Sequence, residues 1–152
     1  MEPLWTDVAQ VAISALTLVA IAFAALQLIF HSRQMHREFE AMYVVRYWEL
    51  MDRRSRPFAL GQAPTRIDYK IILEYLQLSE DEIDLRQRGR VTDATWAFWS
   101  ESIIDQCSSP AYVKTLRGLP ADRLPQVRNL LTMEAGWDPL NRNWFWRRRH
   151  GL

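Results

Sequence analysis

The sequence predicts an all-α protein, with one N-terminal transmembrane helix that continues into a long helix and then a small cytoplasmic helical bundle. Three observations predict this fold. Residues 8–30 form an uncharged apolar block, helix-forming residues with a spaced apolar face follow it, and no segment alternates apolar and polar residues as a strand does. With 152 residues and a net charge of +1, the chain has room for one small domain plus an appendage.

The first predicted element is a transmembrane helix over residues 8–30, preceded by a short outer N-terminus, residues 1–7. No Asp, Glu, Lys or Arg occurs from Val8 to Ser32. A helix rises about 1.5 Å per residue and a bilayer core is about 30 Å thick, so roughly 20 apolar residues span it. The alternative is a buried core helix of a soluble protein. Such helices usually carry a polar face, so the composition favours a membrane span.

A cleaved signal peptide is the second alternative for this block, because Ala22-Phe23-Ala24 has the small-x-small pattern of a cleavage site. Signal peptides begin with basic residues, whereas this chain begins with the acidic residues Glu2 and Asp7. The block is also longer than a usual signal-peptide core. We therefore expect an uncleaved anchor in contact with the lipid bilayer.

The flanking charges predict the orientation of the anchor. Arg33 and Arg37 follow the block, and no Lys or Arg precedes it. Because basic residues stay on the cytoplasmic side, we expect the N-terminus outside, Trp5 at the outer interface and residues 32–152 in the cytoplasm. Of the 19 basic residues all but two are Arg, an excess typical of GC-rich bacterial genomes. The expected location is the bacterial inner membrane.

Small and weakly polar residues form a stripe along the predicted span. At 100° per residue, the members of this stripe fall within about a third of the helix circumference. Such a stripe lets a second helix approach closely and hydrogen-bond. It indicates a helix-association face for a homo-oligomer or a partner span, although spans also tolerate these residues singly. The stripe consists of Gln10, Ser14, Thr17 and Ala24.

A connecting helix is predicted over residues 31–56, because no Pro interrupts the chain between Ser32 and Pro57. Its apolar face includes Phe39, Tyr43 and Leu50, and a basic cluster, Arg53, Arg54 and Arg56, suits its C-terminus. Residues 57–66 hold two Pro and a Gly, and predict a loop. The cytoplasmic bundle is expected to comprise residues 57–143 together with 38–56.

Within the bundle, residues 67–78 predict a mostly buried helix that includes Ile67. Ser79 and Glu82 have the spacing of a capping box, which predicts a new short helix ending at Gly89. The acids at 80, 81, 82 and 84 suit a helix N-terminus, with Glu82–Arg86 and Asp84–Arg88 as ion pairs. The spacing of a calcium loop is absent, so no metal is expected.

Thr92 or Asp93 is predicted to cap a helix that runs to about Cys107 and has one apolar face. That face consists of Trp96, Trp99, Ile103 and Cys107. The aromatic residues are read first as core anchors, with a ligand cage as the alternative. A short helix through Leu116 and closed by Gly118, and a last helix over about 124–135, complete the predicted bundle.

The tail, residues 144–152, interleaves aromatic and basic residues. This pattern suits a membrane surface or an acidic protein partner. The alternative is that the rings pack on the bundle and the Arg side chains are solvated, and nucleic acid is the least favoured partner. The candidate contact residues are Trp144, Phe145, Trp146, Arg147, Arg148 and Arg149.

Catalytic and cofactor signatures are missing from the sequence. The five Gly are isolated, so no phosphate-binding loop exists, and a single Cys excludes a disulfide framework. His31 and His36 are five residues apart and do not face one metal on a helix. We therefore expect no catalytic residues, no metal and no cofactor, and a protein that is not an enzyme.

Three segments resemble a group of small bacterial membrane-anchored helical proteins, the DUF4760-type proteins. The segments are Arg46-Tyr47-Trp48-Glu49-Leu50-Met51, Leu73-Glu74-Tyr75-Leu76, and Gly89-Arg90-Val91 followed by Trp96 and Trp99. The resemblance covers most of the chain after the anchor. It implies a membrane-anchored helical fold, and it implies neither an activity nor a site.

These features lead to a functional hypothesis. We expect a single-pass membrane protein whose cytoplasmic helical domain is a protein-interaction, accessory or regulatory module, with a protein partner or a second copy as its target. The alternative is a membrane-anchored sensor or effector that binds a small ligand in the bundle, among Trp96, Trp99 and neighbouring Tyr. A pore on the polar stripe of the span is a third alternative.

Overall fold

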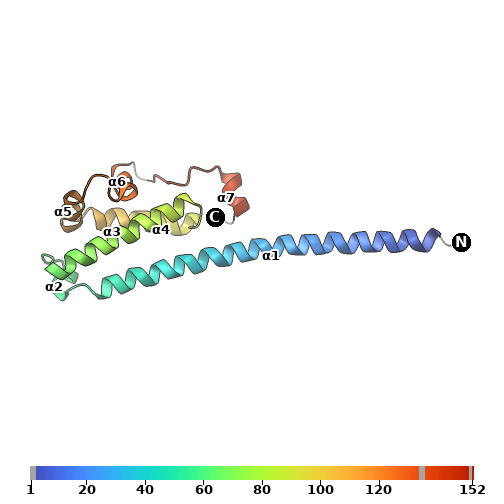
Figure 1. Cartoon of the computed structure of the whole chain (residues 1–152), viewed down its shortest axis with the longest axis horizontal. Helices are drawn as coiled ribbons and strands as arrows, with labels where there is room; N and C mark the ends of the chain where they lie inside the picture. Colours follow the sequence, from blue (N-terminus) through green and yellow to red (C-terminus); the bar gives the residue numbers. More distant parts are fainter. Residues whose placement is uncertain (1–2, 134–135, 151) are drawn as a thin grey trace.

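The computed structural model describes residues 3–133, 136–150 and 152, and leaves out the side chains of residues 3–6, 29, 32 and 33. All regular structure in these ranges is helical, which confirms the predicted all-α fold. Helix α1 (Pro3–Asp52) is a single unbroken helix, and the remaining helices fold back along its C-terminal half (Figure 1).

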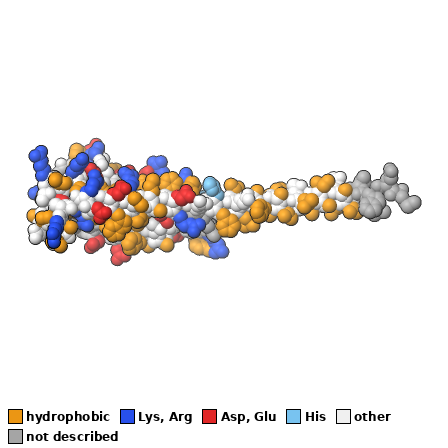
Figure 2. All heavy atoms as spheres, turned by 90° about the horizontal axis from the view of Figure 1, so that it is seen from below, with side chains coloured by type: hydrophobic (Ala, Val, Ile, Leu, Met, Phe, Trp, Pro, Cys, Tyr) orange, Lys and Arg blue, Asp and Glu red, His pale blue; other side chains and the backbone are white. Residues whose placement is uncertain are grey.

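The N-terminal half of α1 stands alone. Asp7–Leu28 is long and apolar enough to cross a membrane, and none of it is buried within the protein. Figure 2 shows the apolar side chains along this projecting half. The alternative of a core helix is therefore wrong, because a core helix is covered by its own domain. The side chain of Trp5 lies outside the described part of the chain.

The helix α1 ends at Asp52 rather than at the predicted Arg56, and a short helix α2 (Arg56–Ala59) replaces part of the predicted loop. The cause lies in α3. The carboxylate of Asp68 accepts hydrogen bonds from the backbone N–H and the hydroxyl of Ser55, at 2.8 and 2.6 Å, which holds the chain in a turn. Arg54 does cap α1 as predicted, by donating to the carbonyl of Met51 at 3.2 Å.

Helix α3 (Arg66–Gln87) is one helix where the sequence predicted two. Ser79 and Glu82 do not form a capping box, because both are buried in the middle of α3. Ile72, Leu76 and Ile83 are fully buried with them, at the spacing of one helical stripe. Burial of that continuous stripe outweighs the local capping signal. Ile67 lies off the stripe and is exposed, contrary to prediction.

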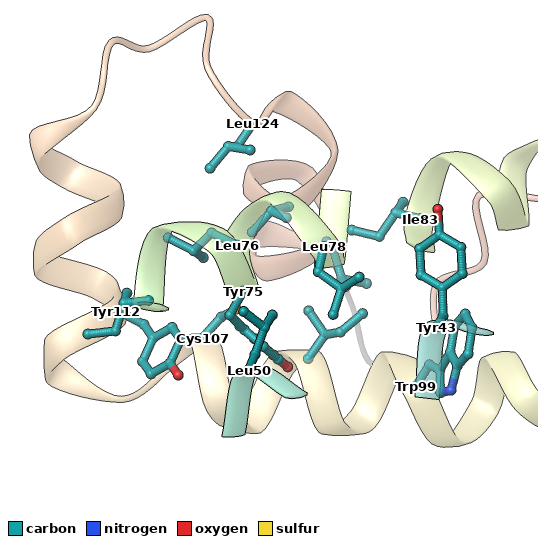
Figure 3. Close-up of a cluster of buried hydrophobic side chains, with 14 of the residues drawn as sticks. Tyr43, Leu50, Tyr75, Leu76, Leu78, Ile83, Trp99, Cys107, Tyr112 and Leu124 are labelled. Atoms are coloured by element: carbon teal, nitrogen blue, oxygen red, sulfur yellow. The ribbon is translucent and has the colours of Figure 1, made fainter. Parts of the chain in front are cut away.

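Helix α3 forms the centre of the bundle and packs against α1, α4 (Asp93–Cys107), α5 (Pro110–Gly118) and α6 (Pro125–Thr132). Figure 3 shows side chains from these helices meeting in one core. Helix α4 agrees with its prediction, from the Thr92 cap to the buried face of Trp96, Trp99, Ile103 and Cys107. Glu40 of α1 accepts from the backbone N–H and hydroxyl of Thr92, both at 2.8 Å, and joins α1 to α4.

Helix α6 is shorter than the predicted helix over 124–135, of which Glu134 and Ala135 lie outside the described residues. It begins after Leu124, which has the left-handed backbone φ of 57°. Pro125 disfavours the right-handed helical conformation at the residue before it. The Glu80 carboxylate accepts from the backbone N–H groups of Gln126 and Val127, at 3.0 and 2.8 Å, and supplies the missing cap from α3.

The tail forms a further helix, α7 (Trp144–His150), which the sequence did not predict as such. It lies beside α1, at the end of the bundle nearest the projecting apolar half (Figure 1). The C-terminal helix α7 therefore lies where α1 projects from the bundle.

Candidate functional site

A histidine holds α7 against α1. The ring Nδ1 of His36 lies 2.9 Å from the carbonyl of Arg90, and Nε2 lies 3.2 Å from the carbonyl of His150. Both partners are acceptors, so both contacts are hydrogen bonds only when both ring nitrogens carry a proton. His36 is buried, and it joins three segments: α1, the turn after α3, and α7.

Trp146 anchors α7 on the bundle. Its indole stacks on the ring of His150, with centroids 3.8 Å apart, and reaches Gly89 at the end of α3. Gly89 has a φ of 70°, and a Cβ there would lie 3.0 Å from the indole. As predicted, Gly89 ends its helix, because the N–H groups of Gly89 and Arg90 donate to carbonyls of the last turn. The same glycine also makes room for Trp146.

A buried arginine is the second attachment of the tail. Arg86 is fully buried and donates to Asp138 at 2.9 Å, to Asp93 at 2.5 Å and to the carbonyl of Val91 at 2.8 Å. Arg147 of α7 joins the same two carboxylates, at 2.8 Å from Asp138 and 2.9 Å from Asp93. We call these four side chains the Arg86 cluster.

The Arg86 cluster replaces one predicted ion pair. Arg86 turns away from Glu82 and toward the cluster, so the predicted Glu82–Arg86 pair is wrong, while Asp84–Arg88 is confirmed at 2.9 Å. Burial raises the pKa of Asp138, but hydrogen bonds from Arg86, Leu140 and Arg147 outweigh it and hold that pKa below its ordinary value. Asp138 is therefore ionised at neutral pH.

The six predicted tail contacts separate into two sets. Trp146 packs on the bundle, as the alternative expected of the rings. Arg147 also joins the bundle, through Asp93 and Asp138, where the alternative expected a solvated side chain. Trp144 and Phe145 are 69% and 70% exposed, and Arg148 and Arg149 are exposed beside them. The guanidinium of Arg148 lies 5.4 Å from the ring centroid of Trp144. Only this exposed set is free to contact something outside the bundle.

A pocket lined by aromatic rings opens between α1, α3 and α4, with a volume of about 240 Å³. The rings of Tyr47 and Trp48 meet nearly at right angles, with centroids 5.2 Å apart, and Tyr47 is 6.1 Å from Tyr75. We call it the aromatic pocket. Its lining is Val44, Tyr47, Trp48, Tyr75, Glu82, Phe98, Trp99, Ser102 and Ile103.

Glu82 is the one carboxyl group in this lining. It is 6% exposed, and it makes no hydrogen bond or ion pair with the residues that the structure describes. Burial raises the pKa of Glu82 to about 8; the charge of Asp81 adds to this effect and that of Arg46 opposes it. The sequence predicted Glu82 in the capping box of a new short helix. Its spacing from Tyr75, Ile83 and Arg86 would have placed it on the buried stripe, had α3 been read as one helix.

The stripe of Gln10, Ser14, Thr17 and Ala24 lies on the exposed apolar half of α1, as expected. The hydroxyl of Thr17 donates to the carbonyl of Ile13 within the same helix, at 2.8 Å. Its donor is thus used internally, which leaves Gln10 and Ser14 as the polar members of the stripe. Association through this face stays a prediction.

The single thiol of the chain, Cys107, lies in surroundings that disfavour nucleophilic chemistry. Cys107 is fully buried, and burial, with the charge of Glu82, raises its thiol pKa to about 12, so the reactive thiolate is disfavoured. Within the part of the chain that the structure describes, no three His, Cys, Asp or Glu side chains gather as a metal site.

Comparisons of the chain with protein-family models, with curated proteins and with solved structures gave no match. The resemblance to DUF4760-type proteins therefore stays a prediction.

Proposed function

We propose that this chain is a single-pass protein of the bacterial inner membrane, with its N-terminus outside and a cytoplasmic helical domain that is an accessory or regulatory interaction module. One observation carries the proposal. The helix that exposes the apolar segment Asp7–Leu28 also buries Tyr43 and Leu50 in the bundle core, without a break. A soluble protein rarely leaves so large an apolar surface uncovered, and a lipid bilayer covers it.

The exposed residues of α7 suit a second contact with the same membrane. His36, which holds α7, is six residues after Phe30, or about 9 Å along the helix from the apolar block. The polar layer of a bilayer extends roughly 5–8 Å beyond its core. Trp144 and Phe145 suit that layer, and Arg148 suits anionic headgroups. Only the end of the bundle that carries α7 would then touch the membrane surface.

Membrane extraction tests the anchor. The full chain is expected to stay in the membrane through high-salt and alkaline carbonate washes, and to keep its full mass of 18.0 kDa. Release by carbonate would contradict a membrane span. A shortened chain that begins after Ala24 would show a signal peptide instead.

Fluorescence quenching tests the contact of α7. In anionic vesicles whose lipids carry bromine near the headgroup, Trp144 should be quenched, so Trp144→Phe should lower the quenched share of the emission. Trp48→Phe is the matched control, because Trp48 is exposed but lies 18 residues after Phe30, about 27 Å along the helix. Equal effects of the two variants would contradict the contact.

Exposed apolar side chains on the bundle support the interaction role. Val45 and Trp48 of α1 and Phe98 of α4 are all more than half exposed, beyond the reach of the membrane. A photo-crosslinking residue at position 45 should give a discrete product of one size in intact cells, whereas position 62, an exposed polar position, should give none. A product with the mass of a dimer identifies a second copy as the partner. No product at position 45 would contradict the interaction role.

A further inference from the structure

The aromatic pocket combines the two features with which proteins recognise organic cations. Aromatic rings converge on it, and the largely buried side chain of Glu82 opens its carboxyl group to the pocket without a hydrogen bond or ion pair in the described chain. We propose that this pocket binds a small soluble organic cation, a quaternary ammonium or a protonated alkyl amine, with Glu82 as its counter-ion. The proposal goes beyond anchoring and interaction, and it gives a ligand class to the alternative role of ligand sensor. It rests on the bundle alone, so it is tested separately from the membrane anchor.

The carboxyl group of Glu82 has no compensating partner within the described chain. A buried carboxylate is costly unless a cation or hydrogen-bond donors compensate it. Here the nearest basic side chain from α1, that of Arg46, lies over the ring of Tyr43 instead, 5.6 Å from its centroid. No Lys or Arg in the described chain lies within ion-pair distance of Glu82. A bound cation would supply the missing partner.

The aromatic lining of the pocket suits a cation. The π-faces of Trp, Tyr and Phe attract cations, and such cages are used for quaternary ammonium groups. Five aromatic residues line this pocket, and those of α1 and α3 meet at steep angles, so they form walls rather than a stack. The volume of about 240 Å³ lies below the usual range for drug-sized ligands and suits a smaller molecule.

The pocket is too far from the apolar block for a lipid to be the source of the cation. Val44, the pocket residue of α1 nearest that block, is 14 residues after Phe30, which places the pocket at least about 21 Å along α1 from the block. Lipid headgroups extend only roughly 5–8 Å beyond the bilayer core. A choline or ethanolamine headgroup in the membrane does not reach the pocket, so the ligand is a soluble molecule.

Titration calorimetry with the full chain in nanodiscs free of choline lipids tests the proposal. Choline and tetramethylammonium should bind saturably, and 3,3-dimethylbutan-1-ol, a neutral isostere of choline, should bind at least about tenfold more weakly, since it lacks the charge. Equal binding of the isostere, or no saturable binding of either cation, would overturn the proposal. The affinity should be the same in nanodiscs that contain choline lipids; competition by those lipids would overturn the soluble source.

Two substitutions and one control locate the site. Glu82→Gln keeps the shape of the side chain and should lower the affinity at least about tenfold. Trp48→Leu changes a half-exposed ring, so the fold should survive, and it should weaken cation binding several-fold. Asp81→Asn removes an exposed acid one residue away and should leave binding unchanged or slightly tighter. Wild-type affinity in both Glu82→Gln and Trp48→Leu would overturn the assignment.

The pH dependence provides an independent readout. Because burial holds the pKa of Glu82 at about 8, the empty pocket is mostly neutral at pH 7, and binding a cation must release a proton. Affinity should therefore rise between about pH 6.5 and 9, and Glu82→Gln should remove this rise. A rise that persists in Glu82→Gln would assign it to another group and overturn this part of the proposal. The titratable and charged groups around Glu82 are Tyr43 and Arg46 on α1, Asp81 and Tyr75 on α3, and Cys107 on α4.

Discussion

The Nε2 atom of His36 on α1 lies 3.2 Å from the backbone carbonyl of His150 on α7, so residues 114 positions apart meet at the end of the bundle nearest the projecting apolar half of α1. His36→Phe keeps a ring of similar size and removes both polar contacts of the imidazole, to the carbonyls of Arg90 and His150. The substitution should lower the free energy of local unfolding of α7 by about 1–2 kcal/mol. Amide hydrogen exchange of residues 144–150 should then be at least about tenfold faster. His31→Phe, at an exposed position on α1, is the control. Unchanged exchange in His36→Phe would show that His36 does not hold α7.

Gly89→Ala should destabilise the bundle for two separate reasons. An L-residue at a φ of 70° is strained, and the new methyl group would lie 3.0 Å from the indole of Trp146. Chemical denaturation should show a loss of about 1–3 kcal/mol. Gly118→Ala, which has open space around the new Cβ, should lose much less.

A second variant separates the two reasons. Adding Trp146→Leu to Gly89→Ala should remove the contact part of the loss and leave the backbone part. Equal stability of Gly89→Ala and Gly118→Ala would contradict both reasons.

Asp68 should make the fold sensitive to acid. Burial raises its pKa, but four hydrogen bonds from Ser55 and Thr65 outweigh burial and hold that pKa at about 2, below the ordinary value of 3.8. Between these two pKa values the unfolded chain binds more protons than the folded chain. The stabilisation that the Asp68 charge gives the fold is therefore complete above about pH 4 and is lost as the pH falls toward 2.

Denaturant titrations at a series of pH values check this prediction. Asp68→Asn should be less stable than the wild type at pH 7, by about 2–3 kcal/mol, and the difference should shrink toward pH 2. Asp105→Asn, at an exposed position, should follow the wild-type curve. A constant difference at every pH would contradict the assignment to the Asp68 charge.

Arg86→Met should be among the most damaging single substitutions. It leaves Asp93 and Asp138 facing each other without the buried guanidinium, and breaking such a network costs about 3–5 kcal/mol. Arg86→Lys should recover only part of this loss, because an ammonium group cannot reproduce the planar fork of donors. Arg88→Met removes one exposed ion pair and should cost under about 1 kcal/mol in thermal or chemical denaturation. A similar loss for Arg86→Met and Arg88→Met would contradict the central role of the Arg86 cluster.

Local signals suffice to predict some elements of this protein. The cap at Thr92 and the spacing of Trp96, Trp99 and Ile103 predict both the start and the buried face of α4. The apolar block predicts the exposed half of α1 for the same reason, since length and composition are properties of that segment alone.

Distant contacts decide the elements that the sequence does not predict. The end of α1 depends on Asp68 in another helix, and the continuity of α3 depends on burial that overrides a capping pattern at Ser79. The candidate site could not be predicted from the sequence either, because it also depends on contacts between distant residues. Glu82 belongs to the aromatic pocket only because rings from α1 and α4 close over it.

Cysteine labelling on the two sides of the proposed span tests the topology of the anchor directly. Glu2→Cys and Gln62→Cys place a thiol on either side of the proposed span, and native Cys107 gives little background because it is fully buried with a thiol pKa of about 12. In intact spheroplasts a membrane-impermeant maleimide should label position 2 and not position 62, and permeabilisation should expose position 62. Labelling of position 62 in intact spheroplasts, or equal labelling of both positions, would contradict a single span with a cytoplasmic bundle.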